Sequence, residues 1–313
     1  MRERMPSTRL ATRAAVLTAL LLQAAAADAQ APDLTSWSVL LSTRYAVSPN
    51  VVYLEADGWQ GRADVYRPTR AGGPVPTVIF FHGGGWIRGD KEGPVLHVMP
   101  YIAMGFAVMN VEYRVAPQAL APAAVQDGRC ALRWVYRNAE RYGFDTTRVV
   151  VTGHSAGGHL ALTTGILDGD AGMDDLCPGE EVLRTAAVVN WYGITDVPDL
   201  LSGPNRRGWA EEWIGTGEER LALATRLSPL SHVRRDMPPI LTIHGDADPT
   251  VPYEHAVRMH RALEAAGVPN RLLTIAGGRH GGLNEAQLLE SYAVIREFLA
   301  LHGITAPGGA PRW

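Results

Sequence analysis

Eight short apolar runs, most of them rich in β-branched residues, recur along the chain and limit the folds it can adopt. They lie at Val51–Glu55, Ala63–Arg67, Thr77–Phe81, Ala107–Val111, Val149–Thr152, Ala186–Tyr192, Ile240–His244 and Arg271–Ile275. Runs of this length bounded by turn-forming residues predict strands. Helical periodicity separates the later runs, most clearly over Ala121–Tyr142, Glu254–Ala266 and Asn284–Leu301. This alternation predicts an α/β fold with a mostly parallel eight-stranded sheet flanked by helices.

The length and charge of the chain limit its organisation and its partners. A chain of 313 residues that is 46% hydrophobic can build one large α/β domain, which we expect over residues 30–305. The formal net charge of −3 is spread along the sequence, without a basic stripe for nucleic acid or a polybasic patch for a membrane. We therefore expect a small-molecule or polymer substrate. The sequence does not indicate the oligomeric state.

The N-terminus has the pattern of a secretory signal peptide. Four arginines fall within Met1–Arg13, Ala14–Leu22 is apolar apart from Thr18, and Ala27-Asp-Ala29 has the small-x-small form of a cleavage site. The alternative is a membrane anchor, but the apolar core is shorter than the ~20 residues that a spanning helix needs. We expect cleavage after Ala29, export to the periplasm or the extracellular space, and no membrane association afterwards. At the other end, residues 306–313 predict a mobile tail.

Cys130 and Cys177 are the two cysteines of the sequence. An exported protein meets an oxidising environment, so the two residues could form a disulfide. Two buried thiols that behave as small hydrophobic side chains are the alternative, and the sequence leaves both open.

The segment 197–235 departs from the alternation of strands and helices. It contains Pro198, Pro204, the pair Arg206-Arg207, Trp209 and Trp213, and no convincing strand. We expect a small lid insertion over the carboxyl edge of the sheet, where open α/β folds bind ligands. An ordinary long connection is the alternative.

Ser155 stands in Gly153-His-Ser-Ala-Gly157, directly after a predicted strand and before a helix-favouring stretch. A sharp strand–turn–helix junction would strain the serine backbone and expose its hydroxyl at the end of the strand. A tight turn without chemistry or a phosphate-binding loop is the alternative. The phosphate interpretation lacks the Lys-Ser/Thr ending of a P-loop and the Gly-x-Gly-x-x-Gly spacing of a dinucleotide site.

A reactive serine needs a base and an acid that orients the base. Of the ten histidines, His280 lies in Ala276-Gly-Gly-Arg-His-Gly-Gly282, a glycine-flanked loop between the last predicted strand and the last predicted helix. The acid should follow the strand Ile240–His244, where Asp246 and Asp248 are both candidates. The alternative role of each aspartate is to form a turn through a side-chain hydrogen bond to the backbone. The order nucleophile, acid, histidine is that of α/β-hydrolases.

Backbone N–H donors must also face the oxyanion that develops in the reaction. The stretch Phe80-Phe-His-Gly-Gly-Gly-Trp86 supplies three unhindered amides after the third strand, and Ala156 adds the amide that follows the serine. A merely flexible glycine loop is the alternative.

At this point the chain resembles the α/β-hydrolase superfamily from about Tyr45 to His302. The motifs His82-Gly-Gly-Gly-Trp86, Glu112-Tyr-Arg-Val-Ala-Pro117, Gly153–Gly157 and Gly245–Pro252 are similar to those of its hormone-sensitive-lipase-like and feruloyl/acetylxylan-esterase-like carboxylesterases. The resemblance implies a serine carboxylic-ester hydrolase without metal or cofactor that acts on short-chain, aryl or carbohydrate-linked esters, including polysaccharide esters. It implies Ser155 as nucleophile, His280 as base and Asp248 rather than Asp246 as acid. It also implies Gly83, Gly84 and Ala156 as oxyanion donors, with Gly85 an alternative to Gly83.

Aromatic residues near the predicted carboxyl edge are candidates for the walls of the substrate pocket, and those we expect there are Trp86, Trp191 and Tyr192, with Trp209 and Trp213 as further candidates. Packing in the core or in the insertion is their alternative role. Two other functions remain open: amide or formamide hydrolysis by the same triad, and a binding protein without catalysis.

Overall fold

The computed structural model describes residues 34–307. The predicted signal peptide lies outside the described residues, as does most of the predicted tail. The chain divides at Arg44: helix α2 (Leu34–Arg44) precedes the division, and every strand of the sheet follows it. No helix within residues 34–307 is long and apolar enough to cross a membrane.

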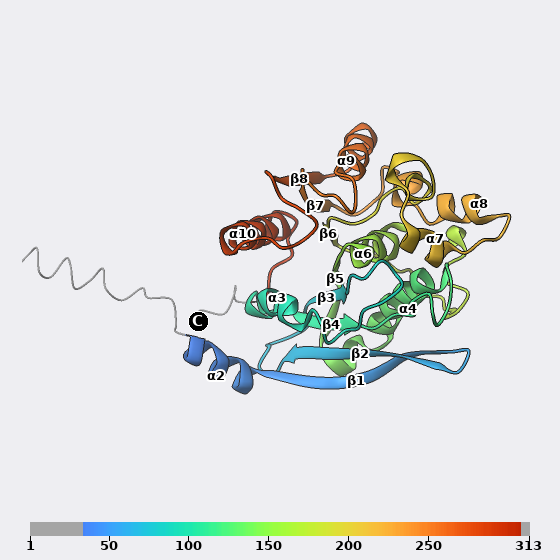
Figure 1. Cartoon of the computed structure of the whole chain (residues 1–313). Helices are drawn as coiled ribbons and strands as arrows, with labels where there is room; N and C mark the ends of the chain where they lie inside the picture. The colour runs from blue at the N-terminus through green and yellow to red at the C-terminus, as the bar shows by residue number, and fades with distance from the viewer. Residues whose placement is uncertain (1–33, 308–313) are drawn as a thin grey trace, which may run out of the picture. The chain divides into compact units, whose positions relative to one another are not determined.

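An eight-stranded sheet forms the centre of residues 45–307 (Figure 1). Its strands are β1 (Tyr45–Ala56), β2 (Trp59–Pro68), β3 (Val75–Phe81), β4 (Ala107–Val111), β5 (Phe144–His154), β6 (Ala187–Trp191), β7 (Ile240–Gly245) and β8 (Asn270–Ile275). Their order is β1-β2-β4-β3-β5-β6-β7-β8. The first two strands pair antiparallel with each other, β2 pairs antiparallel with β4, and all other pairs are parallel. The predicted fold class is therefore confirmed.

Helices cover both faces of the sheet. They are α3 (Met99–Ala103), α4 (Ala123–Arg137), α5 (Ala139–Tyr142), α6 (Ala156–Ile166), α7 (Gly208–Ile214), α8 (Arg220–Arg226), α9 (Glu254–Ala266) and α10 (Glu285–Leu301). In Figure 1, α3 and α10 lie on one side of the sheet, and α4 and α6 lie on the other. Strands β3 and β4 are buried along their whole length, as expected for strands covered on both faces.

Two of the predicted helices agree with the structure and one differs from it. Glu254–Ala266 has the predicted bounds, and α10 follows Asn284, whose side chain accepts a hydrogen bond from Gln287 N in a capping box. The predicted helix Ala121–Tyr142 is interrupted at Asn138, so that α4 and α5 are separate. Asn138 donates its side-chain amide to Trp134 O at 2.9 Å, a local bond of the kind that competes with a continuous helix.

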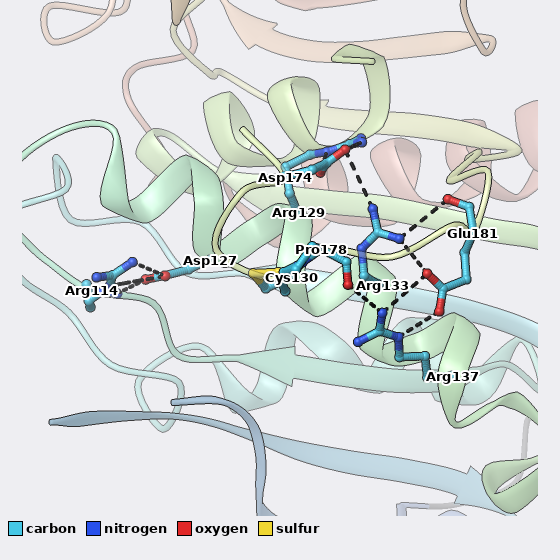
Figure 2. Close-up of a disulfide and its surroundings, with 10 residues drawn as sticks. Arg114, Asp127, Arg129, Cys130, Arg133, Arg137, Asp174, Pro178 and Glu181 are labelled. Carbon is cyan, nitrogen blue, oxygen red and sulfur yellow. Dashed lines mark hydrogen bonds and ion pairs between the residues drawn. A yellow bond between two sulfur atoms is a disulfide. The ribbon is translucent and has the colours of Figure 1, made fainter. Parts of the chain in front are cut away.

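A disulfide joins Cys130 on α4 to Cys177, with their Cα atoms 5.6 Å apart (Figure 2). Arginines on the same helix pair with the segment that carries Cys177. Arg129 pairs with Asp174 at 2.8 Å, and Arg137 pairs with Glu181 at 2.6 Å. The structure thus contains the disulfide, one of the two arrangements open from the sequence.

Candidate active site

Ser155 occupies the junction between β5 and α6, at the middle of the sheet. Its φ of 56° and ψ of −118° lie in a region that non-glycine residues seldom adopt. The N–H of Ser155 donates to Trp191 O at 2.9 Å, which ties the strained turn to β6. The strand–turn–helix context expected for this residue is therefore present.

Two glycines make this turn possible. A Cβ on Gly153 would lie 2.6 Å from Phe81 O, and a Cβ on Gly157 would lie 2.7 Å from the carbonyl carbon of Phe81. Real Cβ atoms do not approach backbone so closely, so β3 can lie beside the turn only if both positions lack a side chain. The close approach also brings the glycine run after β3 next to Ser155.

The structure brings together the three residues expected to form a triad. His280 Nε2 lies 2.8 Å from Ser155 Oγ, and His280 Nδ1 lies 2.7 Å from Asp248 Oδ2. Because the carboxylate accepts the proton of Nδ1, Nε2 is left to accept the serine hydroxyl. The loop after β7 supplies Asp248, and the loop after β8 supplies His280, so the carboxyl ends of three parallel strands meet at one edge.

Asp248 is held as a carboxylate. Its side chain is fully buried, and its Oδ1 accepts the N–H groups of Thr250 and Val251 at 2.7 and 3.0 Å. Burial by itself raises the pKa of Asp248, but hydrogen bonds from His244 and His280 and from the backbone outweigh it and hold the pKa well below its usual range. The ionised form is the one that can orient the histidine.

His244 is a second partner of Asp248 that the sequence reasoning missed. Its ring is fully buried, and Nε2 lies 3.2 Å from Asp248 Oδ2 and 3.1 Å from Val251 O. The N–H on Nε2 can therefore be shared between these two acceptors. Its position four residues before Asp248, at the end of a strand, carries no sequence signal that distinguishes it from a packing residue.

Asp246, the other candidate acid, has a different partner. Its side chain accepts Gly277 N at 2.7 Å and so links the loop after β7 to the loop that carries His280. This bond spans 31 residues and joins two loops, so it is not the local turn-forming use; Asp248 has that use, because its Oδ1 accepts Thr250 N two residues further on.

The glycine run lies beside the serine. Gly83 and Gly84 both line the cavity at Ser155, and a Cβ on Gly83 would be 3.6 Å from the Ser155 Cβ. Ala156 is the first residue of α6, where backbone N–H groups have no partner within the helix. The residues expected as oxyanion donors therefore lie around the serine, with Gly85 on the same cavity.

His82 contacts this glycine run and fixes its position. Its Nδ1 lies 2.7 Å from Gly83 O, its ring stacks on Tyr113 at 4.1 Å, and the Tyr113 hydroxyl donates to His82 O at 2.9 Å. Burial lowers the pKa of His82, so the ring is neutral and donates its Nδ1 proton to the carbonyl. The orientation of the Gly83 peptide is thereby fixed.

The cavity at Ser155 has a volume of about 340 Å³. Its walls come from the glycine run and the residues that follow it, the serine turn, the segment 197–235, and the loops after β6, β7 and β8. They are Gly83, Gly84, Gly85, Ile87, Arg88, His154, Ser155, Tyr192, Trp209, Thr250 and His280. Sequence reasoning missed Ile87, Arg88 and Thr250, although Thr250 lies within the motif Gly245–Pro252.

Of the expected aromatic walls, the structure places Tyr192 on the cavity and corrects two others. Trp86 is fully buried and stacks on Trp213 at 4.1 Å, and Trp191 is 1% exposed. Both are packing residues, and Trp209 lines the cavity instead. Trp86 lies beneath Trp209, with 5.5 Å between the ring centroids.

The segment 197–235 lies at the rim of the cavity through α7. Arg207 donates to Thr250 O and Pro249 O at 2.9 and 3.1 Å, and a Cβ on Gly85 would lie 3.3 Å from the Trp209 ring. The insertion therefore links the acid loop to the glycine run. Its helices α7 and α8 are short, and the segment contains no strand, as expected.

His154, which precedes the serine, is 9% exposed and lines the same cavity. Burial, together with the nearby His97 and His280, lowers the pKa of His154 to about 3. Its ring is therefore neutral near pH 7. Within residues 34–307 there is no group of three or more His, Cys, Asp or Glu side chains that could hold a metal ion.

Comparison with known proteins gives one family and several related esterases. The BD-FAE family model matches residues 63–263. Esterase LipC of Mycobacterium tuberculosis is 32% identical over 231 residues, which cover 70% of this chain and 56% of LipC. The chain thus spans about half the length of these curated relatives, with 54% of the esterase LipQ of the same organism covered.

Solved structures of esterases have the same fold. The thermophilic esterase Est2 of the Planctomycetes species Thermogutta terrifontis has a TM-score of 0.70 and 27% identity, with 82% of this chain and 93% of Est2 covered. The same esterase phosphoramylated by tabun also matches, with a TM-score of 0.70, 28% identity, and 84% and 96% covered. A truncated carbohydrate esterase from gut microbiota has a TM-score of 0.66 and 26% identity, with 82% and 98% covered.

Proposed function

This chain belongs to the BD-FAE family, a group of α/β-hydrolases, and from that premise we propose that it is a serine carboxylesterase. The observation that carries the proposal is the hydrogen-bonded row Ser155–His280–Asp248, which opens onto a cavity beside the glycine run. The relation to Est2, whose structure has been solved with tabun attached, supports a reactive serine.

The proposed reaction begins when Ser155 Oγ attacks the ester carbonyl as His280 Nε2 takes its proton. Asp248 stabilises the imidazolium that forms. The backbone N–H groups of Gly83, Gly84 and Ala156 stabilise the oxyanion, and donors already in place are worth about 3–4 kcal/mol each. The imidazolium then protonates the leaving alcohol, and water releases the acid from the acyl-enzyme by the same steps.

The substrates we propose are short-chain, aryl or carbohydrate-linked esters. A structure of Est2 with bound propionate and the gut carbohydrate esterase support this range. The aromatic rings of Tyr192 and Trp209 on the cavity can hold an aryl group or the face of a sugar.

A substrate panel tests the proposal, with Ser155→Ala as the control for the chemistry. It contains acetyl, butyryl and longer acyl esters, acetylated and feruloylated xylan, and formyl and peptidyl amides. We expect hydrolysis of one or more esters by the wild type and a loss of at least about a thousandfold in Ser155→Ala. Amide cleavage faster than cleavage of every ester would replace the proposal with an amidase.

We also propose that the protein is exported. The signal-peptide pattern over residues 1–29 and the disulfide between Cys130 and Cys177 support export, because disulfides persist mainly in oxidising compartments. Fractionation of the native host should recover the protein outside the cytoplasm with Gln30 as its first residue. A cytoplasmic protein that retains Met1–Ala29 would contradict export and leave the esterase proposal untouched.

A further inference from the structure

The cavity at Ser155 contains one side chain with a permanent positive charge and none with a carboxylate. Arg88 provides the charge, and the other walls are glycine, apolar, aromatic, hydroxyl or imidazole groups. Asp248 lies behind His280, fully buried, and its charge is committed to that ring. A substrate that enters the cavity therefore meets an arginine without a competing acid.

Arg88 has no ion-pair partner among residues 34–307, although carboxylates stand near it in the sequence. Asp90 accepts Gly93 N at 2.7 Å, and Glu92 and Asp64 both pair with Lys91. Each of these acids is thus engaged elsewhere, while the Arg88 side chain is exposed at the cavity.

The backbone of Arg88 is nevertheless fixed against the oxyanion region. A Cβ on Gly84 would lie 2.8 Å from the Arg88 carbonyl carbon and 3.5 Å from its Cγ. The next residue, Gly89, packs so closely on His82 that a Cβ there would lie 2.6 Å from Nδ1. Beyond it, Lys91 is 2% exposed, and its carbonyl accepts Asn110 Nδ2 at 2.6 Å.

This anchoring fixes the Arg88 backbone beside Gly84, one of the expected oxyanion donors, on the wall of the cavity that contains Ser155. An arginine that serves only solubility needs no fixed backbone beside the oxyanion donors. Arg207 adds a second positive charge at the rim, because its guanidinium bonds to the carbonyls of Pro249, Thr250 and Arg206 rather than to a carboxylate.

We propose that Arg88 is a specificity residue that binds a carboxylate carried by the ester substrate, a few bonds from the scissile carbonyl. Arginine suits this role because its planar fork matches a carboxylate in two parallel hydrogen bonds. The substrates are then anionic esters, with the carboxylate on either the acyl or the alcohol part. This inference rests on the proposed esterase function and narrows its substrate class.

Two matched substrate pairs test the proposal. For the alcohol part, 4-acetoxybenzoate is compared with 4-acetoxybenzamide, and for the acyl part, the mono-4-nitrophenyl ester of adipic acid is compared with its carboxamide. Within each pair a neutral amide of nearly the same size and shape replaces the carboxylate, and the same pair on Arg88→Gln accounts for any difference in intrinsic reactivity. The wild type should prefer the carboxylate in at least one pair by roughly tenfold in kcat/KM, mostly through KM, and the preference should shrink as salt rises from 0.05 to about 0.5 M.

Substitution separates a charge effect from a structural one. Arg88→Gln should remove the preference within the pair, Arg88→Lys should retain part of it, and Arg261→Gln, which removes an exposed arginine from α9, should leave it intact. A wild type that hydrolyses the neutral member equally well in both pairs would overturn the inference, as would an unchanged preference in Arg88→Gln. Either result would leave the proposed esterase function standing. Ester hydrolysis that survives Ser155→Ala would instead contradict the proposed esterase function.

Discussion

The backbone conformation of Ser155 is set by the residues packed around the turn between β5 and α6. Gly153 and Gly157 allow β3 to approach the turn, and the strain at φ 56° exposes the hydroxyl to His280. The chemistry of the site thus depends on two positions without side chains as much as on the triad.

Asp248 and Asp246 provide a direct comparison between an acid that orients the histidine and an acid that links two loops. Asp248→Asn should lower kcat by about 10³–10⁴-fold, because the amide would favour the wrong tautomer of His280. Asp246→Asn should change kcat less than about tenfold, since its oxygen can still accept Gly277 N. Steady-state kinetics on one ester tests both, and equal losses would contradict the assignment of roles.

The triad residues Ser155, Asp248 and His280 were predictable from the sequence because each follows its own strand and lies in a local motif. The same reasoning failed for Trp86 and Trp191. The backbone turns sharply after β3, where Trp86 has a φ of 60°, and this sends its ring into the interior. Trp191 is the last residue of β6, and which face it occupies depends on tertiary packing rather than on a sequence pattern.

Helix α4 and the segment that carries Cys177 are joined by two kinds of bond. The disulfide closes a sequence separation of 47 residues, and arginines 129, 133 and 137 pair with Asp174 and Glu181 (Figure 2). Neither Cys130 nor Cys177 lines the catalytic cavity.

Removing the disulfide should therefore reduce stability and spare catalysis. A Cys130→Ala/Cys177→Ala double variant should lose about 2–4 kcal/mol of unfolding free energy, chiefly because the unfolded chain gains freedom. The ion pairs should keep the segment docked, so kcat/KM should stay within about twofold of the wild type. Urea unfolding and ester kinetics test this, and a parallel fall in activity would contradict it.

The course of the insertion 197–235 could not be derived from its sequence. Its pattern excluded a strand correctly, but contacts with other elements place α7: Arg207 bonds to the acid loop, and Trp209 packs over Gly85. The sheet, in contrast, was predictable because each strand is a continuous apolar run. The largest boundary errors fall on β1, β2 and β5, which extend beyond their apolar centres.

Buried neutral histidines are a property of the molecule as a whole. Burial lowers the pKa of His154 to about 3 and the pKa of His159 and His255 to about 4. The unfolded chain takes up protons below about pH 6.5, and the folded chain does not until these lower values are reached. Stability is therefore present above pH 6.5 and is lost as the pH falls towards 4.

Acid should destabilise the fold by up to about 1.4 kcal/mol per pH unit for each of these histidines. His159→Gln, which can still donate to Leu227 O, should have a smaller loss of unfolding free energy between pH 7 and pH 5 than the wild type. Urea unfolding at both pH values measures this difference. An equal loss in both proteins would contradict the role given to His159.

We propose that Ser155 is the one serine within residues 34–307 that is activated for covalent chemistry. A serine-directed fluorophosphonate tests it most directly when intact mass, peptide mapping and residual ester hydrolysis are followed together. We predict one adduct per chain, located on Ser155, with activity falling in proportion to labelling and no adduct on Ser155→Ala. A fully labelled protein that still hydrolyses esters, an adduct on another residue, or no adduct on a folded and active wild type would contradict the account.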